Sequence, residues 1–184
     1  MTDLHSGQFL IADPFLSDPN FQRTVVLLSE YSSSLGSMGF VLNMPCELTL
    51  GELMSAMIGY DFPVFIGGPV QKDLLFFVHQ CKEASIGGKE IFPGVFWGGD
   101  LNEAFEKIKC GLLKENRIKF FLGYSGWSVG QLEQEMELKS WITVDATASI
   151  LFNSKAENTW SDALKEKGGD YTQLIHYPID PILN

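Results

Sequence analysis

The chain has 184 residues, 45% of them hydrophobic, which suits one domain spanning residues 1–184 with a sizeable core. Its 13 Lys and Arg residues against 23 Asp and Glu residues give a net charge of −10, which disfavours direct nucleic-acid binding and binding to anionic membrane surfaces. Three widely spaced cysteines without a CxxC pair fit neither a disulfide framework nor a zinc site, so we expect buried, reduced thiols.

Eight stretches rich in branched apolar and aromatic residues predict β-strands. Most are nearly continuous apolar runs, which indicates strands covered on both faces. The polar residues 32–37 separate two of them and predict a hairpin, whereas the short link between residues 64–67 and 74–79 predicts that these two strands are antiparallel neighbours. The predicted strands are residues 9–12, 24–30, 38–43, 64–67, 74–79, 95–97, 118–124 and 141–144.

Three capping boxes predict helix N-termini, because a side-chain oxygen at the first position and an acid or amide three residues later bond each other's backbone N–H groups. These pairs are Thr49 with Glu52, Asp100 with Glu103 and Ser128 with Gln131, and the helices extend to about residues 58, 114 and 139. A fourth helix is expected over residues 159–167, ended by Gly168. Together these elements predict an α+β protein with a mainly antiparallel sheet or partly closed barrel and about four helices packed against it.

The region from residue 103 to 119 comes closest to a basic stripe, but its basic residues alternate with glutamates. We interpret it as a solvated helix face rather than a phosphate-binding patch. Its basic residues are Lys107, Lys109, Lys114, Arg117 and Lys119. Elsewhere no apolar run approaches the length of a membrane span or of a signal-peptide core, so we expect a cytoplasmic protein without membrane partners.

The segment Gly123-Tyr-Ser-Gly-Trp127 lies between a predicted strand and a predicted helix, where hydrolases place a nucleophilic serine. Such a turn requires glycine at the fifth position, where this chain has Trp127, so we interpret Ser125 as a turn residue that bonds local backbone. An enzyme acting on a small molecule stays an alternative, in which folding would bring Ser125, His79 and Glu133 together in a hydrolase-like site.

The chain carries no complete motif for a cofactor or a metal. The glycine pairs at residues 67–68 and 98–99 match neither phosphate-loop pattern, and His79 has only Cys81 nearby in the sequence, which is too few ligands for a metal. We therefore expect no cofactor and no metal, and we interpret His79 as a strand-end histidine that hydrogen-bonds at the core boundary.

Several polar residues lie among apolar ones and form a candidate binding surface. Arg23 is the only basic residue before Lys72; it could clamp a carboxylate or phosphate, but we favour a structural role, such as pairing with Asp18 or a neighbouring carboxylate. We expect a non-enzymatic binding or regulatory protein whose partner is a protein or a small ligand. The candidate contacts are Asn20, Arg23, Asn43, His79, Ser125, Trp127, Gln131 and Glu133.

Several long segments also match the pattern of a known family. They include Gly7-x-Phe-Leu-Ile-Ala, Asp18-Pro-Asn-Phe-x-Arg-Thr-Val-Val-Leu-Leu, Met38-Gly-Phe-Val-Leu-Asn-x-Pro45, Val64-Phe-Ile-Gly-Gly-Pro-Val70 and Leu122-Gly-Tyr-Ser-Gly-Trp-Ser-x-Gly-Gln-Leu-Glu133. On these segments the chain resembles the bacterial YqgE/AlgH family, which implies a cytoplasmic single-domain α+β protein with no settled activity. Members are sometimes labelled transcriptional regulators. No basic recognition helix is visible here, so any regulation would act through a protein or small ligand.

Overall fold

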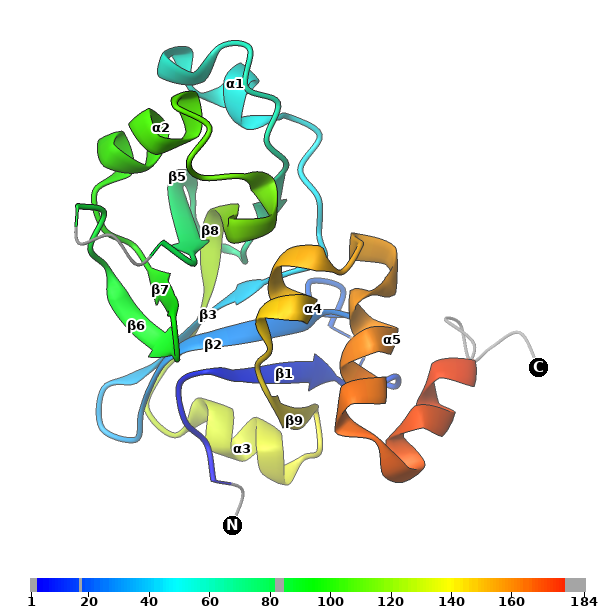
Figure 1. Cartoon of the computed structure of the whole chain (residues 1–184). Coiled ribbons are helices and arrows are strands. Elements are labelled where there is room, and N and C mark those ends of the chain that lie inside the picture. Colours follow the sequence, from blue (N-terminus) through cyan, green and yellow to red (C-terminus); the bar gives the residue numbers. More distant parts are fainter. Residues whose placement is uncertain (1–2, 17, 82–84, 178–184) are drawn as a thin grey trace.

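The computed structural model describes residues 3–16, 18–81 and 85–177, and a β-sheet forms its centre (Figure 1). Across these residues the strand order is β6-β7-β5-β8-β3-β2-β1-β9, and β4 pairs with β8 beside this path. Only β4 and β8 are parallel, so the predicted α+β architecture with a mainly antiparallel sheet is confirmed. The sheet is open, with β6 and β9 at its ends. The strands are β1 (Gln8–Ala12), β2 (Val25–Ser32), β3 (Gly36–Val41), β4 (Val64–Ile66), β5 (Val70–His79), β6 (Lys89–Phe92), β7 (Val95–Trp97), β8 (Ile118–Trp127) and β9 (Trp141–Asp145).

Helices cover both faces of this sheet. Within the described residues they are α1 (Leu50–Leu53), α2 (Leu101–Lys109), α3 (Gln131–Glu137), α4 (Ala148–Asn153) and α5 (Ala156–Lys167), with 3-10 turns at Ser55–Met57, Glu115–Arg117 and Gly169–His176. In this part of the chain, no helix combines the length and the apolar character needed to cross a bilayer.

All three predicted capping boxes form hydrogen bonds, but only Thr49 with Glu52 forms the reciprocal pair that was predicted. Ser128 is not an N-cap, because α3 begins at Gln131 with Gly130 as its N-cap. All three helices are also shorter than predicted. The bonds run from Thr49 N–H to Glu52 (2.8 Å), from Glu103 N–H to Asp100 (3.2 Å) and from Ser128 N–H to Gln131 (3.0 Å). Two elements were not predicted, α4 and β6. Each is only four to six residues long, which is too short for the period of its apolar residues to be recognised.

The long strand β8 joins two halves of the sheet. Its residues 118–122 and Tyr124 pair with β5, and its residues 125–127 pair with β3. Between them Gly123 has a φ of +67°, a conformation that glycine adopts without steric cost. We call β4 to β7 with α1 and α2 the β5 half, and β1 to β3 and β9 with α3 to α5 the β2 half. In Figure 1 α1 and α2 lie at the top, α3 lies at the bottom, and β8 runs between them.

Strands β4 and β5 are not neighbours, contrary to the prediction from their short connection. Both pair with residues 120–122 of β8, so they lie on its opposite sides. The connection passes close to the backbone of β8: a Cβ at Gly67 would lie 2.3 Å from the Gly123 carbonyl oxygen, and one at Gly68 would lie 2.3 Å from the carbonyl carbon of Tyr124. Only glycine allows this approach, and the sequence prediction did not use that constraint.

Strands β1 and β2 are covered on both faces, as their continuous apolar runs predict. On one face Phe9 and Ile11 pack with Trp160 of α5, and on the other Leu10 packs with Leu132 of α3. A separate core in the β5 half includes Leu50, Phe77, Phe105 and Phe120. The thiol prediction is wrong in part, because the three free cysteines are half-buried at Cys46 and Cys81 and exposed at Cys110.

Candidate functional site

Arg23 and Asn43 meet at the start of β2. The Asn43 side chain donates to the Arg23 carbonyl (2.9 Å) and accepts from the Val25 N–H (3.0 Å), which ties the start of β2 to the end of β3. The Arg23 guanidinium lies 4.6 Å from the centre of the Trp160 ring and donates to the Tyr177 carbonyl. Burial lowers the pKa of Arg23. The Arg23 Nε atom is buried and has no hydrogen-bond partner among the described residues.

Asn20 lies in an exposed turn and bonds only locally. Its backbone N–H and its side-chain amide donate to the Asp18 carboxylate at 2.9 and 3.0 Å. Within the described chain Asp18 does not pair with Arg23, so that version of a structural role is wrong. Arg23 has its structural contacts with a ring and a carbonyl instead.

Three further candidates, Trp127, Gln131 and Glu133, lie on or near α3. With Tyr31, Glu135 and Trp141 they form a group that we call the α3 cluster. Glu135 Oε2 accepts hydrogen bonds from the indole N–H groups of Trp127 (2.9 Å) and Trp141 (2.7 Å). Its other oxygen accepts from the Gln131 amide (3.1 Å). Sequence reasoning missed Glu135, although the two neighbouring tryptophans are donors that require an acceptor when buried.

Glu133 belongs to the same cluster through Tyr31. The Tyr31 hydroxyl donates to Glu133 at 2.8 Å, and this hydrogen bond raises the pKa of Tyr31. Every polar group of the α3 cluster named here therefore has a partner inside the protein.

His79 and Ser125 are both fully buried. The His79 ring lies between Phe77 and Phe96, with centroids 5.6 and 5.7 Å away, and its Nδ1 accepts from the Cys81 N–H at 3.1 Å. Burial lowers the pKa of His79. The Ser125 hydroxyl donates to a backbone carbonyl, that of Gly67, at 3.1 Å.

The geometry does not assemble the hydrolase-like alternative. His79 pairs with Ile118 at the beginning of β8, whereas Ser125 lies seven residues further along the same strand. At about 3.3 Å per residue that separation is about 23 Å. Glu133 contacts Tyr31 in the β2 half, so the three proposed groups do not converge.

The sequence-based prediction for Lys119, which lies in β8, is wrong. We expected it on a solvated face, but it is only 7% exposed, and it is the one buried Lys, Arg, Asp or Glu among the described residues. Side chains alternate along a strand, so Ile118 and Phe120 enter the core of the β5 half while Lys119 points to the same side as Phe121. A lone lysine inside an apolar run predicted to be covered on both faces was the available signal.

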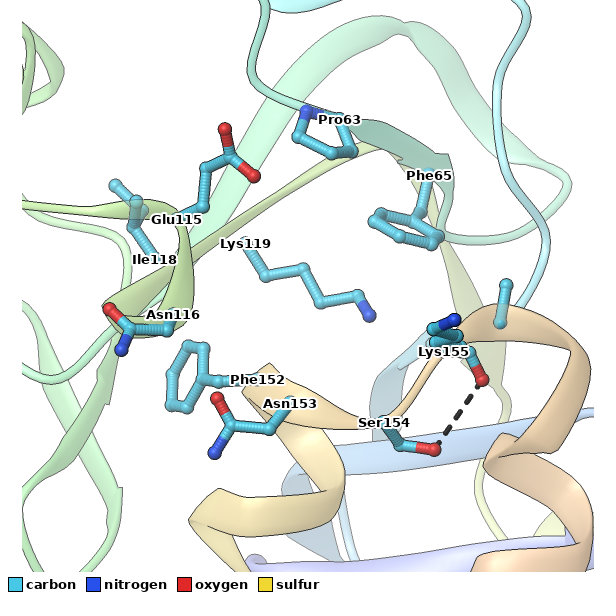
Figure 2. A pocket seen from close by; sticks show the side chains of 11 residues that line it. Pro63, Phe65, Glu115, Asn116, Ile118, Lys119, Phe152, Asn153, Ser154 and Lys155 are labelled. Atoms are coloured by element: carbon cyan, nitrogen blue, oxygen red, sulfur yellow. Dashed lines mark hydrogen bonds between the residues drawn. The ribbon is translucent and has the colours of Figure 1, made fainter.

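The Lys119 pocket is a hollow of about 430 Å³ between β4, the turn Glu115–Arg117 and the connection from α4 to α5 (Figure 2). Figure 2 shows the Lys119 side chain extending from β8 into this space. The pocket is lined by aromatic rings, two amides and two further charged groups. These are Phe65, Phe152, Asn116, Asn153, Lys155 and Glu115.

The charge of Lys119 has no acidic partner. Its Nζ lies 3.8 Å from the centre of the Phe65 ring, and no described residue pairs with it by an ion pair or hydrogen bond. Burial lowers the pKa of Lys119 to about 8. A ring contact of this kind contributes about 0.5–2 kcal/mol, whereas burying an unpaired charge costs several kcal/mol. The pocket therefore holds a cation that an anionic molecule would stabilise.

Metal-ligand groups are a separate question. Residues 3–16, 18–81 and 85–177 contain no cluster of three or more His, Cys, Asp or Glu side chains suited to a metal ion.

Comparison with known proteins gives full-length similarity. A family model described as AlgH-like matches residues 9–172. A UPF0301 protein of Chlorobium limicola is 44% identical over 98% of this chain and 96% of its own length, and one of Cytophaga hutchinsonii is 40% identical over 98% and 100%.

Solved structures are similar as well. The solution structure of AlgH from Pseudomonas aeruginosa has a TM-score of 0.74 and 31% identity, covering 94% of this chain and 93% of that one. A crystal structure of a Corynebacterium diphtheriae protein has a TM-score of 0.80 at 20% identity, covering 96% and 94%, which shows likeness of fold. None of these printed names states a ligand or an activity.

Proposed function

The chain belongs to the AlgH-like family, and we propose that it is a non-enzymatic binding protein that holds a small anionic ligand in the Lys119 pocket. One observation carries the proposal: a buried ammonium group faces a pocket, and none of the described residues is its acidic partner. A carboxylate or phosphate oxygen of a ligand would supply the missing counter-charge.

The lining supports an anion of small size. Lys119 and Lys155 carry two positive charges against the one negative charge of Glu115, so the pocket keeps a net positive charge in an acidic protein. The amides of Asn116 and Asn153 add hydrogen-bond donors. A volume of about 430 Å³ lies within the range of about 300–1,000 Å³ that is typical of small-molecule sites.

The position of the pocket suggests how occupancy would be transmitted. Lys119 belongs to the strand that joins the two halves, whereas Phe152 and Lys155 belong to the connection from α4 to α5. In our proposal a bound anion links these two regions, and the protein serves a regulatory role in the cytoplasm through a partner that recognises the occupied form.

Thermal unfolding of the full chain with lactate, succinate, glucose 6-phosphate and inorganic phosphate tests the proposal. A ligand at a hundredfold excess over its Kd adds about 2.7 kcal/mol, which is about 5–10 °C in Tm for a chain of this length. We expect at least one anion to raise the Tm of the wild type and of Lys114→Met, an exposed control, but not that of Lys119→Met. Equal shifts in all three proteins, or no shift with any anion, would overturn the proposal.

Among the eight residues predicted from sequence, one observation favours Arg23 as a second candidate for ligand binding. Its Nε is buried without a hydrogen-bond partner. An Arg23→Ala variant in the same screen separates the two candidates. An anion-induced shift that Arg23→Ala loses and Lys119→Met keeps would assign binding to Arg23, and the reverse pattern would assign it to Lys119.

A further inference from the structure

The environment of the Lys119 amine suits a nucleophile as well as the counter-ion of a bound anion. Its side chain is buried, yet its Nζ faces the pocket. Among the described residues, the buried side-chain nitrogen and oxygen atoms that lack a hydrogen-bond partner belong to Arg23, His79 and Trp97. Nζ of Lys119 also lacks a hydrogen-bond partner among these residues but is not one of the buried atoms, so it is accessible from the pocket. A molecule in the pocket can therefore reach this atom (Figure 2).

We propose that Lys119 forms a reversible imine with a small 2-oxo carboxylate, a proposal that rests on the anion-binding function above and names its ligand class. The pocket offers an amine, a nearby apolar wall and separate donors for a carboxylate. Phe65 and Phe152 supply the apolar wall, and Lys155 and Asn153 supply charge and a hydrogen-bond donor. A ligand that carries a ketone or aldehyde next to its carboxylate uses all three features.

The pocket makes the uncharged amine available near neutral pH. Burial lowers the pKa of Lys119 to about 8. At pH 7.4 roughly one fifth of the Lys119 side chains would be neutral, against roughly one in a thousand for an ordinary exposed lysine. Lysines with a lowered pKa in apolar surroundings are the ones that form Schiff bases.

The reaction requires no oxidant, reductant or metal. The neutral amine donates its electron pair to the carbonyl carbon, and one proton moves from the nitrogen to the carbonyl oxygen through solvent to give a carbinolamine. The hydroxyl group then takes a proton from solvent and leaves as water while the nitrogen electron pair forms the C=N bond, and the nitrogen releases its remaining proton to solvent. Water that re-enters the pocket reverses the sequence, so the adduct reports ligand concentration without turnover.

Other hollows lack this combination. A pocket of about 540 Å³ beside β9 is lined by Asp13, Lys139 and Lys167, and none of these three is buried. Their amines and carboxylates face solvent, so no lining lysine there combines burial with access to a pocket.

Reductive trapping tests the imine. The full chain is incubated with pyruvate or glyoxylate and sodium cyanoborohydride at pH 7.4, and intact mass and peptide mapping locate the added group. We expect Lys119 to be labelled at least about tenfold faster than the exposed Lys155, and the labelling rate at Lys119 to rise between pH 6 and pH 9. Labelling spread evenly over exposed lysines, with none in excess at Lys119, would overturn the proposal.

A Lys119→Arg variant separates the imine from anion binding, because arginine keeps the positive charge and cannot form this adduct. We expect Lys119→Arg to lose the trapped adduct. Lactate, which has a carboxylate and no carbonyl, reports on anion binding alone. A lactate-induced Tm shift without trapping of pyruvate would contradict the imine and leave anion binding standing. Trapping without any effect of lactate would support the imine and contradict simple anion binding.

Discussion

The two ends of β8 contrast in how their polar groups are satisfied. At the C-terminal end, Trp127 bonds Glu135, which in turn bonds Trp141 and Gln131. At the N-terminal end, Lys119 is buried against a phenyl ring and has no acidic partner among the residues that the structure describes. One end of the strand is a closed hydrogen-bond network, and the other holds an unpaired charge beside a pocket.

This contrast distinguishes structure from function within one element. At the C-terminal end of β8, which carries the long sequence motif, the polar side chains form hydrogen bonds that hold α3 and β9 to the sheet. The end without a motif keeps a residue that costs stability, which is the arrangement expected where a ligand is to supply the missing partner. Under the proposal that Lys119 binds an anion, the specific sequence motif does not by itself locate the binding site.

The junction between the two ends should be the most sensitive point. A Cβ at Gly123 would lie 2.6 Å from the Val70 carbonyl oxygen, and the φ of Gly123 is +67°. We expect Gly123→Ala to lower the free energy of unfolding by about 3–5 kcal/mol, from backbone strain and collision together. Urea denaturation followed by circular dichroism measures this change.

Gly111→Ala is the matched control for that variant. Gly111 has a φ of +71° and nothing within 4 Å of the position of a Cβ, so the substitution introduces the strain without the collision. We expect it to cost about 1 kcal/mol. Equal losses in the two variants would mean that the close approach of the β4 to β5 connection does not constrain β8.

The passage of the β4 to β5 connection past β8 also shows which parts of the fold the sequence could not predict. Continuous apolar runs identified most strands, and capping boxes identified the N-caps of α1 and α2 and placed the beginning of α3 two residues too early, because those signals are local. The placement of β4 and β5 on opposite sides of β8 depends on contacts between Gly67 and Gly123, which are 56 positions apart and leave no local pattern. A short connection was a poor guide where glycines let the chain cross another strand.

The candidate site likewise has one part that local sequence patterns predict and one part that depends on tertiary contacts. The bonds of Gln131 and Ser128 follow from a capping box and were predictable. The pocket requires Lys119 to face Phe152 and Lys155 across two elements, and the pairing of these elements is a tertiary feature. The sequence did show a lysine inside an apolar run, but only the fold shows that no carboxylate in the described part of the chain pairs with it.

Replacing the unpaired charge should stabilise the protein, which is the sharpest test of the contrast. We expect Lys119→Met to raise the free energy of unfolding at pH 7 by about 1–3 kcal/mol, because the pKa of Lys119 falls from 10.5 to about 8 on folding. Urea denaturation from pH 7 to pH 10.5 measures the difference between variant and wild type.

The sign of its pH dependence is fixed by linkage. Between pH 8 and pH 10.5 the unfolded wild type holds a proton that the folded protein has released, so the stability of the wild type rises with pH. The advantage of Lys119→Met is therefore full below pH 8 and fades toward pH 10.5. The exposed control Lys114→Met should stay within about 0.5 kcal/mol of wild type throughout. A Lys119→Met variant that is less stable than wild type at pH 7 would show that the ammonium is already satisfied.

The smallest expected effect comes from the closed network at the other end of β8. In Glu135→Gln the new amide group must face either the indole donors of Trp127 and Trp141 or the amide donor of Gln131, so at least one donor meets another donor. Hydrogen bonds to a carboxylate contribute about 1.5–3 kcal/mol, and part of that is retained, so we expect a loss of about 1–2 kcal/mol in urea denaturation. Glu137→Gln, on an exposed position of the same helix, should change stability by less than about 0.5 kcal/mol. If Glu135→Gln were as stable as that control, the hydrogen-bond network would not stabilise the protein. The contrast between a stabilising network at one end of β8 and an unpaired charge at the other would then no longer support ligand binding at Lys119.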